Sequence, residues 1–106
     1  MDEKELYTAL IAKLSKDFSL EGSFLPVSAD LALIKEFLVK RINELMSRDY
    51  ERFLNRLYRI DVSESKVQEI LHSKDKTTVT EKLADLIIER QMLRLKTQVL
   101  YKQGKL

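Results

Sequence analysis

The sequence predicts an all-α protein, a single compact bundle of about five helices with a long C-terminal helix. Apolar residues recur every three or four positions along most of the chain, which is the spacing of an amphipathic helix. The chain also contains only two glycines and one proline, residues that punctuate sheets and tight turns. With 44% hydrophobic and 34% charged residues, we expect one globular domain over residues 1–106.

The N-terminal half contains two predicted helices and a loop. In residues 2–18 an apolar side chain recurs at every fourth position from Leu6 to Phe18, and acidic residues open the segment where a helix dipole favours negative charge. Residues 19–27 carry a glycine and the only proline yet stay apolar, so we expect a loop packed onto the core. The second helix is expected from about residues 28–30 to 46. Together with the C-terminal helix it forms the long core.

Two shorter helices follow, joined by a tight turn. Residues 49–59 follow the i, i+3, i+4, i+7, i+8 spacing of apolar positions without a miss. A helix is then expected over residues 64–72 with Ser63 as its N-cap. Asp61 and Glu64 offer an alternative capping box, which leaves the boundary open by about two residues.

The final predicted helix has more apolar surface than one packing face requires. Thr78 or Thr80 is expected to cap it, and it should run to about Lys102, just before a glycine. Its apolar residues spread over more than one face of the helix. One stripe is expected to pack on the bundle, which leaves the remainder for a partner such as a second copy of the chain.

Composition excludes several classes of protein. The absence of cysteine excludes a disulfide scaffold, a thiolate zinc site and a cysteine nucleophile, and it fits a reducing cytoplasm. The N-terminal segment begins with acidic residues and resembles no signal peptide. No stretch reaches the roughly 18 to 20 consecutive apolar residues of a membrane helix. We therefore expect a soluble, cytoplasmic protein that does not bind a membrane.

Charge is distributed unevenly along the chain. Residues 1–53 carry 8 basic and 10 acidic groups, whereas residues 54–106 carry 11 basic and 7 acidic groups. From Arg90 onward there are five basic residues and no acidic residue. This asymmetry suggests a partner with acidic character.

Side chains that enzymes ordinarily use are scarce. His72 is the only histidine, and its position at a predicted helix end is typical of a charge partner for the helix dipole. Two glycines cannot form a phosphate-binding loop. Glu81, Asp85 and Glu89 share a helix face but lack the Glu-x-x-His pairs of di-iron helical proteins. We expect no enzyme activity, no cofactor, no metal and no small-molecule substrate.

The predicted helix at residues 49–59 and the residue before it carry a row of arginines, the arginine stripe. Their spacing of 4, 4 and 3 places them within about 80° of one another, opposite the apolar face. Guanidinium groups bind phosphate and carboxylate oxygens bidentately, so the stripe is a candidate site for an anion or a partner. Glu44 and Asp49 favour the other interpretation, a solvated face with local ion pairs. The stripe consists of Arg48, Arg52, Arg56 and Arg59.

The segment LYRIDVSESKVQEIL, which starts at Leu57, is similar to the DNA-binding helix-turn-helix, whose second helix enters the major groove. Here that second helix would expose Glu64 and Glu69 toward phosphates, and Asp61 stands near the place of a glycine that is frequent in such turns. We favour a structural corner. The alternative is a nucleic-acid-binding protein that uses residues 49–72, with the arginine stripe supplying phosphate contacts.

The same segment, together with LADLIIERQ at residues 83–91, resembles a group of small bacterial proteins of unknown activity. In that group a similar YRIDVSE segment precedes a similar LA-LI-ERQ helix. The resemblance covers roughly residues 50–95, and it implies a compact helical protein of a cytoplasmic bacterial type. It implies no activity and no site residue.

Taken together, these observations predict a non-enzymatic helical protein–protein interaction module. Its partner is expected to be another protein or a second copy of the chain. Nucleic acid is the less favoured partner.

Overall fold

Five α-helices and a short 3-10 turn form the described part of the chain, which confirms the predicted fold class. The computed structural model describes residues 3–18, 30–102 and 104, and the predicted loop at residues 19–27 lies outside these ranges. The C-terminal helix is the longest, with 24 residues. The elements are α1 (Glu3–Phe18), α2 (Leu31–Arg48), α3 (Tyr50–Arg59), α4 (Glu64–Leu71), η2 (Lys76–Thr78) and α5 (Val79–Lys102).

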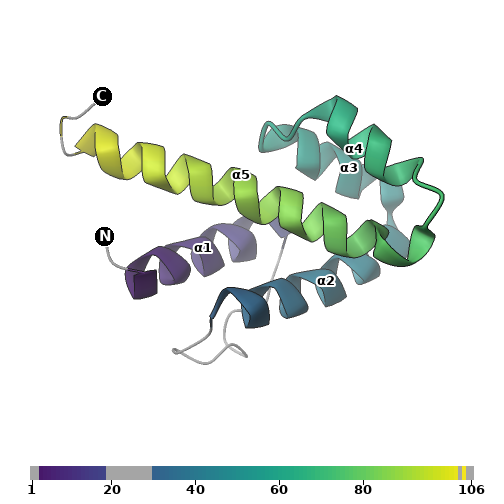
Figure 1. Cartoon of the computed structure of the whole chain (residues 1–106), viewed down its shortest axis with the longest axis horizontal. Coiled ribbons are helices and arrows are strands. Elements are labelled where there is room, and N and C mark those ends of the chain that lie inside the picture. Colours follow the sequence, from purple (N-terminus) through teal and green to yellow (C-terminus); the bar gives the residue numbers. More distant parts are fainter. Residues whose placement is uncertain (1–2, 19–29, 103, 105–106) are drawn as a thin grey trace.

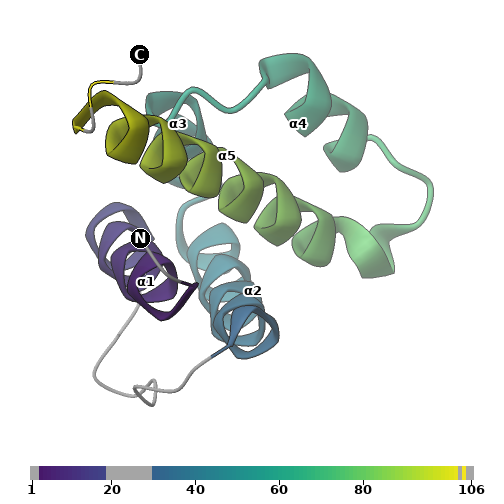
Figure 2. The same cartoon turned by 60° about the vertical axis from the view of Figure 1, so that its left-hand side comes forward.

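Helix α5 is the central element of the bundle. It runs along the whole length of the molecule, with α1 and α2 on one side and α3 and α4 on the other (Figures 1 and 2). The most extensive helix–helix contact is between α2 and α5, followed by that between α1 and α5. The predicted pairing of the second and last helices as the long core is therefore confirmed.

Side-chain caps fix the starts of three helices, because an Asp or Ser oxygen accepts a hydrogen bond from an otherwise unpaired backbone N–H. Asp30 accepts from the backbone N–H of Leu33 at 2.9 Å. A single residue, Asp49, separates α2 from α3 and accepts from the N–H of Arg52 at 3.1 Å. Ser63 is the N-cap of α4, as predicted.

The turn between α3 and α4 is a Schellman motif with an aspartate in the glycine position. Asp61 has φ 62°, the left-handed conformation that glycine adopts most easily. Its N–H donates to the carbonyl of Tyr58 at 3.1 Å, and the N–H of Val62 donates to the carbonyl of Leu57 at 3.5 Å. Asp61 thus performs the role for which a helix-turn-helix often uses glycine.

The start of α5 differs from the prediction. Neither Thr78 nor Thr80 caps it, because their hydroxyls donate to the backbone oxygen of Asp75 and to the side chain of Asn43. Instead, Asp75 caps the preceding turn η2, where the side chain and backbone of Thr77 both donate to its carboxylate. These hydrogen bonds hold the pKa of Asp75 below its ordinary value.

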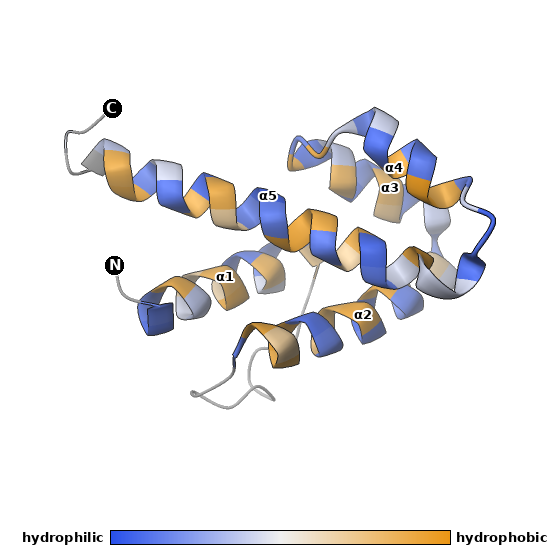
Figure 3. Cartoon of the chain, viewed as in Figure 1, coloured by the Kyte–Doolittle hydropathy of each residue, from blue (hydrophilic) through white to orange (hydrophobic). Residues whose placement is uncertain are grey.

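Apolar side chains from all five helices meet in one core, and hydrophobic residues line the inward sides of α1 and α2 (Figure 3). The rings of Phe18 and Phe53 lie 6.2 Å apart at 53°, which joins the end of α1 to α3. The buried apolar helical side chains are Leu10, Leu14 and Phe18 of α1, Ile34, Leu38 and Ile42 of α2, Phe53 and Leu57 of α3, Val67 of α4, and Val79, Leu83, Ala84, Ile87, Ile88 and Leu95 of α5.

Candidate anion-binding pocket

The structure divides the arginine stripe. Arg48, Arg52 and Arg59 are exposed, whereas Arg56 is half-buried. The position of Arg56 corrects the expectation that all four arginines lie opposite the apolar face. Arg56 is three residues from Phe53, so its side chain lies only about 60° around the helix from that buried ring.

The reason for this difference is Tyr50. Its spacing assigns it to the buried face of α3, but in the structure it is 42% exposed. The buried face is instead centred on Phe53, Leu57 and the helix-capping residue Ile60. The buried face of α3 is therefore rotated around the helix toward Arg56, and the side chain of Arg56 lies at the edge of the core.

Arg56 and Arg59 line a cavity of about 360 Å³ at the junction of three helices, which we call the basic pocket. Helix α1 contributes Lys16 and Asp17, and α5 contributes Arg94. Among the described lining residues, four cationic side chains therefore face one carboxylate, an excess of three formal positive charges. Arg48 and Arg52 do not line it. The lining residues are Lys16, Asp17, Arg56, Arg59, Ile60 and Arg94.

Two further arginines fix the helix ends that form the walls of the basic pocket. The Nε of Arg41 donates to the carbonyl of Phe18 at 3.0 Å, which satisfies an orphan carbonyl at the end of α1. The Nε of Arg90 donates to the carbonyl of Ile60 at 3.2 Å, at the end of α3. Each bond ties a helix C-terminus to a neighbouring helix, so the pocket is built on anchored backbone.

A buried glutamine forms a polar network beside the pocket. Gln91 of α5 is fully buried and is the only buried polar side chain among the residues that the structure describes. Its Nε2 donates to the carboxylate of Asp17 at 2.5 Å, and its Oε1 accepts from Nη1 of Arg94 at 3.5 Å. The carboxylate of Asp17 thus accepts from the neutral amide of Gln91, and the same amide holds the guanidinium of Arg94 through its oxygen.

The guanidinium of Arg56 is incompletely satisfied. Its Nη1 atom is buried and has no hydrogen-bond partner among the described residues. A buried donor without an acceptor costs about 1–3 kcal/mol, and more when the group is charged. The negative end of the α3 dipole stabilises a cation in the last helical turn, but it supplies no acceptor to this nitrogen. Because Arg56 also lines the basic pocket, an anion bound there is a candidate acceptor for this guanidinium.

Among the described residues, the cations of the basic pocket also form no ion pair with a carboxylate. None of the ion pairs within residues 3–18, 30–102 and 104 involves Lys16, Arg56, Arg59 or Arg94. Their charge is therefore not cancelled by the described acidic side chains, except by Asp17 at the pocket wall. An uncompensated cluster of this kind attracts anions.

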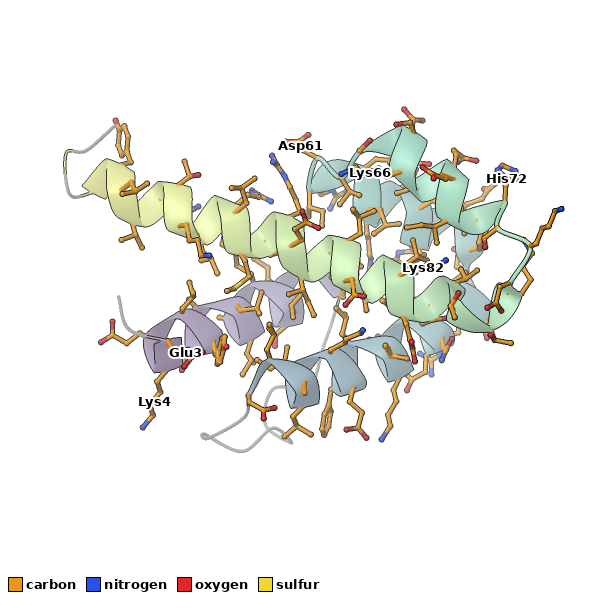
Figure 4. All side chains as sticks on the ribbon, viewed as in Figure 1. Glu3, Lys4, Asp61, Lys66, His72 and Lys82 are labelled. Carbon is orange, nitrogen blue, oxygen red and sulfur yellow. The ribbon has the colours of Figure 1, made fainter. Side chains whose placement is uncertain are left out.

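A larger hollow between α4 and α5 contrasts with the basic pocket. Lys66 and Lys82 line it from facing helices (Figure 4), and its volume is about 580 Å³. Glu69, Asp85 and Glu89 also line it, so its two lysines are matched by three carboxylates. Charge balance leaves this hollow without a preference for an anion, despite its greater size.

Several members of the site were missed by sequence reasoning. Lys16 and Asp17 stand at the end of the first helix in no pattern that links them to α3, and only the fold brings them to it. Gln91 did carry a signal, because it stands seven residues after Ala84 and four before Leu95, both buried. A polar residue in this core register predicts a buried hydrogen-bond network.

The helix-turn-helix-like corner has the local form that the sequence predicts. The exposed face of its second helix carries both acidic and basic side chains. Helix α4 exposes Glu64, Lys66, Gln68 and Glu69, and its C-cap His72 is exposed too. The hydroxyl of Tyr58 accepts a hydrogen bond from Gln68 at 3.2 Å, so part of this face is used to hold α4 on α3. Helix α4, the second helix of the corner, therefore offers little positive charge to a phosphate backbone.

No protein-family model, no curated protein and no solved structure matches this chain. No helix in the described part is long and apolar enough to cross a membrane. Within the same part, no three His, Cys, Asp or Glu residues are grouped so that they could hold a metal ion.

Proposed function

We propose that this chain is a non-enzymatic interaction module that binds an anionic group of a protein partner in the basic pocket. The observation that carries the proposal is the buried Nη1 of Arg56, which has no partner among the described residues and belongs to a side chain that lines a cavity together with three more cations. An anionic oxygen would complete the hydrogen bonding of this guanidinium and neutralise the pocket. The anchored ends of α1 and α3 support a preformed site, which lowers the entropic cost of binding.

A pair of charge-matched variants tests this proposal. R56Q/R94Q removes two positive charges from the pocket, and R48Q/R52Q removes two from the exposed part of the same stripe. Partners captured from native extract by the immobilised protein would be identified and their binding measured with purified components. We expect at least a tenfold loss of affinity for R56Q/R94Q and less than a twofold change for R48Q/R52Q. Equal losses for both variants would contradict the proposal.

The alternative is binding of nucleic acid by residues 49–72. The exposed side chains of Arg48, Arg52 and Arg59 favour it, since they are available to phosphates. This alternative predicts affinity for duplex DNA that falls steeply with salt and is abolished by R48Q/R52Q. The pocket proposal predicts that R48Q/R52Q is silent, so the same two variants separate the hypotheses.

A further inference from the structure

We infer that the group recognised by the basic pocket is a phosphomonoester dianion, such as that of a phosphorylated side chain. This inference rests on the proposed function and specifies the chemistry of its ligand. Three properties of the pocket carry it: the charge excess, the number and type of its donors, and the nature of its walls.

Charge favours a dianion over a carboxylate. The lining groups that the structure describes leave an excess of three formal positive charges. A single carboxylate would neutralise one of them, whereas a phosphomonoester carries about −1.5 to −2 at pH 7. Because Asp17 already accepts from buried Gln91, it is held in the wall and competes less for the arginines.

The donors are predominantly guanidinium groups. Arg56, Arg59 and Arg94 approach the cavity from two different helices, and Lys16 approaches from a third. A phosphoryl group presents three terminal oxygens, each able to accept hydrogen bonds, and arginine forks match this geometry bidentately. A carboxylate has two oxygens in one plane, so it can pair bidentately with fewer of the three arginines.

The walls indicate a small polar ligand group. Ile60 is the only apolar residue among the described lining residues, and no aromatic ring is among them. A nucleotide base would therefore find no aromatic ring on which to stack among these residues. A volume of about 360 Å³ lies at the low end for ligand pockets, which suits a phosphoryl group with its first carbon atoms and some water.

Two probes that differ only in the anion test the inference. Phenyl phosphate and benzoate share the same ring, and their binding to the full chain can be followed by NMR titration of arginine side-chain signals. We expect phenyl phosphate to bind at least tenfold more tightly at pH 7. R56Q should weaken phenyl phosphate at least tenfold and R48Q less than twofold, while R56K should give an intermediate loss because lysine keeps the charge without the fork. Thermal unfolding of each variant verifies that it is folded.

The pH dependence gives a second, independent readout. The charged groups that face the cavity are Lys16 and Asp17 from α1, Arg56 and Arg59 from α3, and Arg94 from α5. No histidine, the side chain that ordinarily titrates near neutrality, is among them. Since the second pKa of a phosphomonoester is about 6, binding of the dianion should weaken roughly tenfold from pH 7 to pH 5. Sulfate should show no comparable change.

Three peptides distinguish the source of the ligand: one with phosphoserine, one with serine and one with glutamate at the same position. They also separate failure of the phosphate inference from failure of the proposed function. Tighter binding of the phosphopeptide than of phenyl phosphate supports a protein source, and equal binding supports a small phosphomonoester. If the glutamate peptide binds as tightly as the phosphopeptide in an Arg56-dependent way, the phosphate inference is overturned and the proposed function stands. If no anion binds in an Arg56-dependent way, both are overturned.

Discussion

The two halves of α5 belong to one continuous helix but make opposite kinds of contact. From Val79 to Arg90 the helix buries five apolar side chains against its neighbours and exposes charged ones to solvent. From Gln91 onward its buried residues are the polar Gln91 and the apolar Leu95. In the same half, large apolar side chains are exposed: Leu93, Leu100 and Tyr101, at 55%, 39% and 75%.

This difference separates the stabilising part of the molecule from the part that is free to bind. The first half follows the rule that apolar side chains are buried. Helix α5 packs against both α2 and α4. The second half departs from that rule twice, with a polar residue inside and apolar residues outside. Departures of this kind are expected at functional or strained sites. The basic pocket includes Arg94 from this half of α5.

The largest effect is expected from truncating the apolar first half. Ile87 is fully buried, and I87A should lower the free energy of unfolding by about 3 kcal/mol, because it removes buried methylenes and leaves a cavity. L93A in the second half should change it by less than about 0.5 kcal/mol. Urea unfolding followed by circular dichroism measures both. Similar losses for the two variants would remove the distinction between the halves.

The next largest effect is expected at Gln91, the polar exception. Q91A removes a buried side chain and the hydrogen bond to Asp17, and it should cost about 2 kcal/mol. Q91L fills a similar volume, and half-buried Asp17 can turn to water, so we expect a loss below about 1.5 kcal/mol. If Q91L is as damaging as Q91A, the polar network stabilises the fold more than volume does.

The sequence predicted the fold well because periodicity, caps and turn residues are local signals. The stripe from Leu6 to Phe18 is sufficient to define α1, and Ser63 is sufficient to begin α4. The basic pocket was predicted only in part, since it depends on the packing of helices distant in sequence. Periodicity placed Arg56 on the solvated side because it counted Tyr50 as buried, and nothing near Lys16 indicates that α3 lies beside it.

A smaller effect is expected at Asp61, whose turn holds the end of α3 against the boundary between the halves of α5. Its carboxylate lies 4.0 Å from Arg90, and both D61G and D61A remove this exposed ion pair. Glycine adopts the left-handed conformation freely, whereas alanine is strained there, so D61G should be about 1 kcal/mol more stable than D61A. Comparing the two variants by thermal unfolding cancels the loss of the ion pair. Equal stabilities would contradict the assigned role of the turn.

The smallest effect on stability, and the most informative for the second half of α5, is expected from its exposed apolar residues. Leu93 and Leu100 are seven positions apart and so share a helix face, which favours the prediction that this surface meets a second copy of the chain. L93S/L100S should change monomer stability by less than about 0.5 kcal/mol, because neither side chain is in the core.

If the chain self-associates here, wild type should sediment with a mass near twice 12.5 kDa and the variant near 12.5 kDa. A wild-type monomer at high micromolar concentration would contradict self-association. The basic pocket would then be the one feature of this half of α5 still assigned to a partner.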